Sequence, residues 1–216
     1  MQPWQGRHPD RVPARVPSGD RSPSQGVRGF VQGLFGCKVR TGLRRLDGHA
    51  TRTALRSRHP APSCSAAAAA STTSVVVACS TYADFSGQSA GSLDFAAVML
   101  NSTNGSEIWR WQGGTDAADK LSAVTVVEDG PIVLAGYTTG DWATSNLGME
   151  DFAAVTLSLD GDEISRFQGG TAEEDVFEAV ERTSNNTVVF AGHTGGSWNG
   201  TNVGGKDFVA VKTLDF

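Results

Sequence analysis

Short apolar runs separated by turn-forming residues dominate the chain from about Ser74 to Phe216. Asp-Gly and Asn-rich clusters tolerate the positive φ angles that tight hairpin turns need. The most apolar run, Val188-Val189-Phe190-Ala191, is typical of a strand buried on both faces. The pattern therefore predicts an all-β region, in which one stretch contains four strands paired around turns at Asp160-Gly161 and Ser184-Asn185-Asn186: Phe152–Leu157, Glu163–Phe167, Val176–Arg182 and Thr187–Thr194.

This pattern of strands repeats about every 56 residues. Several separate segments keep the same period, which indicates internal duplication of one structural unit. Ala78-Cys79-Ser80-Thr81 is a weaker copy of the segments Ala135–Thr138 and Ala191–Thr194. The matching segments are Asp94–Val98 with Asp151–Val155 and Asp207–Val211, Gln112–Thr115 with Gln168–Thr171, Ala135–Thr138 with Ala191–Thr194, and the single aromatic residues Phe85, Trp142 and Trp198.

The combination of Asp-Phe-x-x-Val, Trp/Phe-Gln-Gly-Gly-Thr and Ala-Gly-x-Thr-x-Gly-x-Trp resembles the SBBP-type β-propeller repeat. The resemblance covers about Ser74–Phe216 and implies four-stranded antiparallel blades. It departs from the family pattern at Cys79 and Ser80, where a Gly-aromatic pair is expected. Beginning with a strand at Ser74–Ser80, the region should hold about ten strands, or two and a half blades. We therefore expect a partial β-propeller at 74–216.

An incomplete propeller leaves open strand edges that favour self-association. Three interpretations are open for it: a fragment of a larger propeller, which we favour, a ring assembled from several chains, or a stub that folds alone.

The chain divides by charge into a basic arm and an acidic body. Residues 1–60 carry twelve basic and three acidic residues, a net charge of +9, whereas 61–216 carry six basic and twenty acidic residues, a net charge of −14. Rich in Arg, Pro, Ser and Ala, residues 1–73 are expected to be disordered. Four interpretations of this arm are open: a transit peptide, a linker, a nucleic-acid-binding segment, or the product of a wrongly assigned translation start. Nucleic acid is disfavoured, because no aromatic residues are interleaved with the arginines.

The compartment is left open, with an extracellular or organellar location favoured over the cytosol. No apolar run is long enough to predict a membrane span, and no secretory signal follows Met1. Because Cys37 and Cys64 fall in the arm, Cys79 is alone in the body, and the spacing predicts no disulfide there.

Three repeated aspartates, Asp94, Asp151 and Asp207, are the candidate metal ligands. A structural role, in which each carboxylate fixes a turn, is favoured over a calcium site, although the oxygen-rich loops before Asp151 and Asp207 suit a hard cation. Asp119 and Asp175 also recur at the repeat period, which favours the same turn-fixing role. The Gln-Gly-Gly-Thr segments are interpreted as turns, because they lack the glycine order of a nucleotide-binding loop. No cofactor is expected otherwise.

Two pairs of repeated residues are candidate binding residues: Trp142 with Trp198, and Tyr137 with His193. The tryptophans either pack between blades or lie at a rim where they could stack on sugars. His193 replaces Tyr137 of the preceding unit, which favours a surface role over catalysis. Four sequons fall in predicted turns, at Asn101, Asn104, Asn185 and Asn199, and leave glycosylation open.

No converging set of catalytic side chains is apparent from the sequence. The function expected is therefore that of a non-catalytic β-propeller repeat protein that forms a binding or scaffolding surface, with an unknown protein or glycan partner. The alternatives are an extracellular carbohydrate- or calcium-binding module and a fragment of a propeller-fold enzyme.

Overall fold

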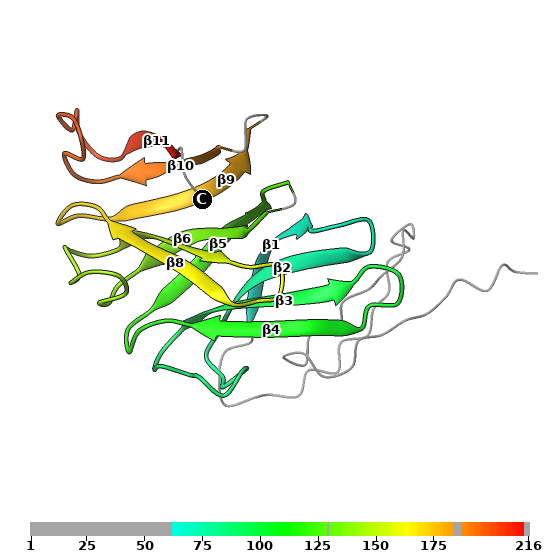
Figure 1. The fold of residues 1–216 in the computed structure, drawn as a ribbon. Helices are drawn as coiled ribbons and strands as arrows, with labels where there is room; N and C mark the ends of the chain where they lie inside the picture. The colour runs from blue at the N-terminus through cyan, green and yellow to red at the C-terminus, as the bar shows by residue number, and fades with distance from the viewer. Residues whose placement is uncertain (1–61, 129, 184–186, 214–216) are drawn as a thin grey trace, which may run out of the picture.

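The computed structural model describes residues 62–128, 130–183 and 187–213, which form strands and no helix (Figure 1). The predicted all-β class is thus confirmed, whereas residues 1–61 of the arm lie outside the described residues. With no helix in these ranges, none is available there to cross a membrane. The strands are β1 Ser63–Ala69, β2 Ser74–Thr81, β3 Asp94–Asn101, β4 Glu107–Gly113, β5 Asp119–Val126, β6 Ile132–Thr138, β7 Asp151–Leu157, β8 Glu163–Gly169, β9 Asp175–Arg182, β10 Val188–Thr194 and β11 Asp207–Thr213.

The strands form three antiparallel sheets, and each sheet joins strands that are consecutive in the sequence. The first sheet has the order β1-β2-β3-β4, the second β5-β6-β7-β8, and the third β9-β10-β11. The four strands predicted within 152–194 are all present, and the turn at Asp160-Gly161 has Gly161 at a φ of 90°. Ser184-Asn185-Asn186 lies outside the described residues.

The grouping of strands into units differs from the sequence prediction. The segment 152–194 was expected to be one unit, but β7 and β8 belong to the second sheet and β9 and β10 to the third. The chain changes sheets after the Gln-Gly-Gly-Thr segments rather than after the most apolar strand. The repeat period sets the distance between equivalent residues, but it does not show which connection within a period crosses to the next sheet.

Strand β1 corrects the expectation that the arm extends to residue 73. It pairs with β2 over Ser63↔Ser80 to Ala69↔Val75, so the folded region begins about ten residues earlier than predicted. The sequence Ser-Cys-Ser-Ala-Ala-Ala-Ala has little intrinsic preference for a strand. Pairing with the apolar β2 supplies the order that the composition did not predict.

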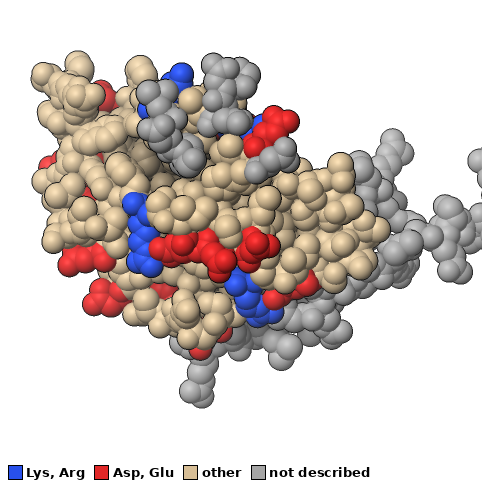
Figure 2. Space-filling model, in the orientation of Figure 1, with Lys and Arg blue, Asp and Glu red and all other residues tan. Residues whose placement is uncertain are grey.

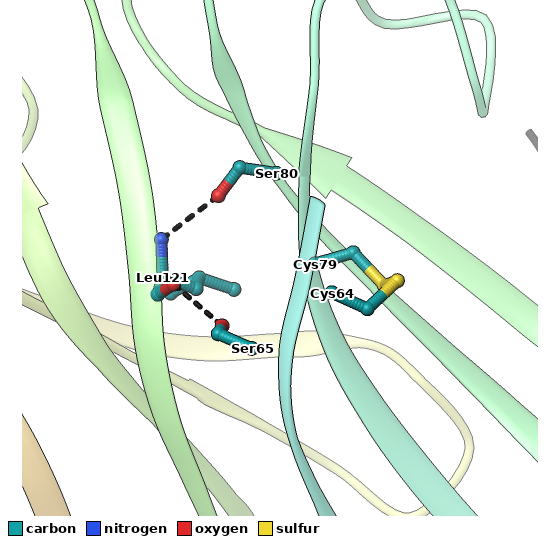
Figure 3. Close-up of a disulfide and its surroundings, with 5 residues drawn as sticks. All are labelled: Cys64, Ser65, Cys79, Ser80 and Leu121. Carbon is teal, nitrogen blue, oxygen red and sulfur yellow. Dashed lines mark hydrogen bonds between the residues drawn. A yellow bond between two sulfur atoms is a disulfide. The ribbon is translucent and has the colours of Figure 1, made fainter. Parts of the chain in front are cut away.

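A disulfide joins Cys64 of β1 to Cys79 of β2, and this finding overturns the prediction of no disulfide (Figure 3). The prediction was wrong because Cys64 had been placed in the arm. The two cysteines are direct partners in the register of the strands, and their Cα atoms are 3.8 Å apart. Close by, Ser65 and Ser80 both bond the backbone of Leu121 in β5, at 2.7 and 3.0 Å, and so connect the first two sheets.

The cysteine pair takes the place of a glycine and a large apolar residue in the other sheets. Leu121 pairs with Gly136 in the second sheet, and Phe177 pairs with Gly192 in the third. A side chain at Gly136 would collide with the carbonyl oxygen of Lys120. The sequence departs from the repeat at Cys79 because the two strands are joined by a covalent bond at this position, where the other sheets have close backbone packing at a glycine.

Two apolar clusters hold the three sheets together. The first cluster packs Phe95 and Ala97 of the first sheet against Leu121 and Leu134 of the second. The second packs residues of the second sheet, among them Phe152, against residues of the third. Strand alternation explains this arrangement, because successive side chains of the middle strands point to opposite faces. Both faces of the middle strands β6 and β7 are consequently buried, whereas the outer strand β8 is mostly exposed.

No segment of the described part of the chain covers one face of the third sheet. Val188 and Phe190 of β10 pack toward the second sheet, but the alternate residues are exposed or half-buried. Strand β10 is therefore buried on one face, and the prediction of burial on both faces was wrong for it. We call this surface the uncovered face; it consists of Val189, Ala191, His193, Phe208, Ala210 and Lys212, which are paired in register across β10 and β11.

The disulfide predicts a large effect of reduction on stability. Closing the loop between residues 15 apart in sequence is worth about 3 kcal/mol in the unfolded-state entropy model. For a folded region of this size that corresponds to a drop in Tm on the order of 10 °C. We expect dithiothreitol to lower the Tm by this amount in differential scanning fluorimetry.

The matched control is the double variant Cys64→Ala/Cys79→Ala. Its Tm should equal that of the reduced protein and should not respond to the reductant. An equal response of the variant and the wild-type protein to dithiothreitol would contradict an effect of this bond.

Candidate functional site

A buried hydrogen-bond network surrounds Gln168 at the end of the outer strand β8. Its Oε1 accepts bonds from the backbone N–H groups of Trp142 and Ala143, at 2.7 and 2.9 Å. Its Nε2 donates to the carbonyl of Gly140 and, at 2.7 Å, to Oδ2 of Asp151 at the start of β7. Asp151 Oδ2 also accepts the N–H of Leu147 at 2.9 Å. One glutamine thus connects the outer strand, the loop between β6 and β7, and the first residue of β7.

The first sheet repeats this arrangement with Gln112 and Asp94. Gln112 accepts the N–H groups of Phe85 and Ser86, and it donates to Ala83 and to Asp94 Oδ2 at 2.6 Å. We call the pair of a strand-end glutamine and a strand-start aspartate the Gln–Asp tie. Because all four side chains are buried, each tie pairs the glutamine amide and the aspartate Oδ2 away from water, whereas Oδ1 of Asp94 and of Asp151 has no hydrogen-bond partner among the described residues.

The third sheet has the aspartate of the tie without the glutamine. Asp207 Oδ2 accepts the N–H of Val203 at 2.9 Å, as its equivalents accept from their own loops. No glutamine side chain reaches it within 62–213. Asp207 is half-buried, whereas Asp94 and Asp151 are fully buried.

The three aspartates do not form one site, because they begin strands in three different sheets. Each is bonded to the loop that precedes it, in agreement with the turn-fixing interpretation. Among the described residues, no group of three or more His, Cys, Asp or Glu side chains is placed to hold a metal ion. Calcium binding stays an untested prediction.

A second set of buried carboxylates fixes the turns where the chain changes sheets. Asp119 Oδ2 accepts the N–H of Thr115 at 2.5 Å, and its Oδ1 accepts the hydroxyl of Thr138. In the next sheet, Asp175 accepts the N–H and hydroxyl of Thr171. The prediction that the Gln-Gly-Gly-Thr segments are turns is thus right for their last two residues, whereas the first two end the strands β4 and β8. Burial raises the pKa of Asp119 above its ordinary value of 3.8, against the opposing effect of the hydrogen bond from Thr138.

The two repeated tryptophans point from their loops toward the neighbouring sheet rather than toward solvent at an open rim. Trp142 is 6% exposed and makes edge contacts with Phe95 and Trp111. The guanidinium of Arg166 lies 3.9 Å from the centre of its ring. Trp198 is half-buried and packs 4.9 Å from Phe152. Packing between sheets, the favoured interpretation, is confirmed for both.

Tyr137 and His193 occupy equivalent, half-buried positions at one end of their sheets. His193 bonds Glu174 at 3.2 Å, and Glu174 also forms a 2.5 Å ion pair with Lys206. The bonds from Lys206 and His193 hold the pKa of Glu174 below its ordinary value. Burial raises the pKa of Tyr137, with a smaller contribution from nearby carboxylates. The His193–Glu174 and Lys206–Glu174 pairs stabilise this end of the sheet. Among the described residues they place no nucleophile beside a base.

A cavity of about 200 Å³ opens between the second and third sheets beside β11. Sequence analysis did not find it. Among its lining residues, Thr156 and Ser165 stand where the first sheet has the larger Met99 and Trp109, which belong to or pack against the first apolar cluster. Its lining is mainly apolar: Val133, Ala154, Thr156, Ser165, Phe167, Phe177, Phe190, Val211 and Thr213.

Charged side chains on the face drawn in Figure 2 are mostly acidic, and basic ones lie beside them. Arg110 pairs with Glu107 and Arg166 with Glu163 within the two outer strands. An excess of negative charge over 61–216 repels a phosphate backbone, and the absence of a nucleic-acid partner stays an untested prediction.

Comparison of the chain with models of protein families and with curated proteins gives no match. The resemblance to the SBBP-type repeat therefore rests on the repeated residues alone, and the propeller arrangement remains a prediction beyond the three stacked sheets.

The Gln–Asp tie predicts a strong dependence of stability on Gln168. The Gln168→Ala variant removes the amide donor of Asp151 and leaves the loop N–H groups of Trp142 and Ala143 without their acceptor, which costs about 2–4 kcal/mol. Urea unfolding followed by tryptophan fluorescence measures the loss. Asp207→Ala is the comparison, because only one loop N–H loses its partner; its loss should be under about 1 kcal/mol. Equal losses in the two variants would contradict the role of the tie.

The raised pKa of Asp119 predicts a specific pH dependence. A carboxyl whose pKa is higher in the folded state than in the unfolded state contributes stability that is complete below 3.8 and is lost as pH rises through the folded-state pKa. We expect the free energy of unfolding of the wild-type protein, relative to Asp119→Asn, to increase as pH falls and to level off below 3.8. Urea unfolding over a pH series measures it, and a difference that shrinks on acidification would overturn it.

Proposed function

We propose that the chain is a non-catalytic β-propeller repeat protein whose stacked sheets form a binding or scaffolding surface within a larger propeller. The observation that carries this proposal is the uncovered face of the third sheet. Its Phe208 is 90% exposed, whereas the equivalent residues Phe95 and Phe152 are 1% and 0% exposed. A large apolar side chain that is buried in two repeats and exposed in the third indicates a missing neighbour.

The two existing junctions indicate what that neighbour is. Phe152 stacks on Phe177 of the following sheet at 4.4 Å, and Phe95 meets Trp142 of the following sheet at 5.3 Å. By the same geometry, Phe208 should pack against a further sheet of this repeat. We propose that a second copy of the chain supplies it in solution. Burying one phenylalanine contributes about 1.5–3 kcal/mol, so the contact favours association.

The repeated polar residues support a structural rather than a catalytic interpretation. Asp94, Asp151 and Asp119 direct their carboxylates to loop N–H groups, threonine hydroxyls and glutamine amides of the same chain. Because the recurring polar groups bond within the chain, we expect a partner to be bound through surface shape and apolar contacts. Burial of Trp142 also removes half of the paired aromatic surface on which a carbohydrate-binding function would depend.

The disulfide supports an oxidising compartment as the site of this function. Bonds between cysteines persist in secreted, periplasmic and organellar proteins and are rare in the cytosol. Cys64 is exposed, so a reducing environment would reach the bond. We therefore propose an extracellular or organellar location.

The proposal predicts concentration-dependent self-association of the full chain. Phe208→Asp places a charge in the proposed contact and should shift the protein toward monomer at every concentration. Analytical ultracentrifugation measures the distribution of species.

Met149→Asp is the matched control, because Met149 is also an exposed apolar residue, at 59%, but it lies in the loop before β7. It should associate like the wild-type protein. A wild-type chain that stays monomeric at all concentrations, or an equal effect of the two substitutions, would reject the uncovered face as the contact.

A further inference from the structure

The outer edge of β11 lacks the strand that the first two sheets have at this position. Strand β4 pairs with β3, and β8 pairs with β7, from Phe152↔Gly169 to Leu157↔Glu163 in the second case. Among residues 62–128, 130–183 and 187–213, no strand pairs with β11 on that side. All seven residues of β7 are buried, whereas Val209 is the one buried residue of β11. Backbone N–H and C=O groups along this edge are thus available to an added strand.

The outer strands β4 and β8 share a sequence pattern, Glu-Ile-x-Arg-aromatic-Gln-Gly. The glutamine and the arginine of the pattern have the same contacts in both sheets. The glutamine makes the Gln–Asp tie. The arginine lies over a loop ring, Arg110 over Phe85 at 4.7 Å and Arg166 over Trp142 at 3.9 Å.

The glutamate and the last glycine of the pattern also have equivalent places in the two sheets. The glutamate bonds the arginine three residues later, as Glu107 does with Arg110, and so orients the guanidinium. The glycine lies opposite the phenylalanine of the neighbouring strand, as Gly169 lies opposite Phe152.

The third sheet presents the receiving group for each of these side chains. Asp207 Oδ2 has its loop N–H bond but no glutamine within the described ranges. Trp198 is equivalent to Trp142, and no arginine of the described residues lies over its ring. In place of a glutamine amide, Asn202 Nδ2 donates to the carbonyls of Gly195 and Gly196 at 3.1 and 3.4 Å. The N–H of Trp198 bonds Gly196 instead of a glutamine oxygen.

We propose that the edge of β11 is an acceptor site for an extended protein segment of the type Glu-Ile-x-Arg-aromatic-Gln-Gly. The segment adds as an antiparallel strand, its glutamine bonds Asp207, and its arginine covers Trp198. Main-chain hydrogen bonds give the affinity, and the two side-chain contacts give the specificity. The site is distinct from the uncovered face, since it uses the edge of the sheet and the loop at 195–205.

A fluorescent peptide copying residues 162–170 of the chain, Asp-Glu-Ile-Ser-Arg-Phe-Gln-Gly-Gly, is the probe. We expect saturable binding to the full chain, measured by fluorescence anisotropy. A peptide with Gln168→Ala, or a chain with Asp207→Ala, should bind about tenfold more weakly, as expected for one charge-assisted hydrogen bond. The two changes together should weaken binding no more than either alone, because they remove the same contact.

The controls keep the outcome specific. A peptide with Ser165→Ala and a chain with Asp160→Ala, both outside the contacts, should bind as the unchanged pair does. Phe208→Asp should shift the protein toward monomer but keep peptide binding. Asp207→Ala should weaken peptide binding about tenfold but keep self-association, so the two proposals fail separately. Absence of binding at millimolar peptide, or additive effects of Gln168→Ala and Asp207→Ala, would overturn the acceptor site.

Discussion

A buried glutamine amide bonded to a buried aspartate is the interaction on which each complete sheet depends. In the second sheet, Gln168 and Asp151 connect the outer strand β8, the loop between β6 and β7, and the start of β7. A buried carboxylate without donors costs far more than a lost surface bond, because its charge is removed from water. The outer strand and the loop before the third strand are therefore expected to order together. This requirement also explains why both residues recur at the same period.

The junctions between sheets vary more than the ties. Between the first and second sheets, Trp109 and Trp111 fill the outer part of the interface, and the indole N–H of Trp109 bonds the carbonyl of Leu159 at 2.8 Å. Ser165 and Phe167 take these positions in the next junction, and Phe167 is 43% exposed. The apolar contacts thus tolerate changes of volume, whereas the hydrogen-bonded ties have a fixed geometry that admits few substitutions.

Sequence reasoning predicted the strands well where apolar runs alternate with turns, and it predicted the structural role of Asp94, Asp151 and Asp175 from their period. It could not assign strands to sheets, since the repeat has no marker for the crossing connection. It missed β1, because Ser63–Ala69 has a low strand preference and is ordered by pairing with β2. The Cys64–Cys79 bond was missed for the same reason. The cavity beside β11 is lined by small side chains, such as Thr156 and Ser165, and a period search does not measure side-chain volume.

The sequential order of the strands in each sheet has a consequence for how the protein is made. Every hairpin pairs neighbours along the chain, so each sheet can assemble as soon as its last strand leaves the ribosome, without waiting for a distant partner. Contacts between sheets then follow one junction at a time from the N-terminal side. Such vectorial assembly protects the apolar face of each finished sheet with the next one synthesised, and it makes the newest sheet the part of the nascent chain that most needs a chaperone.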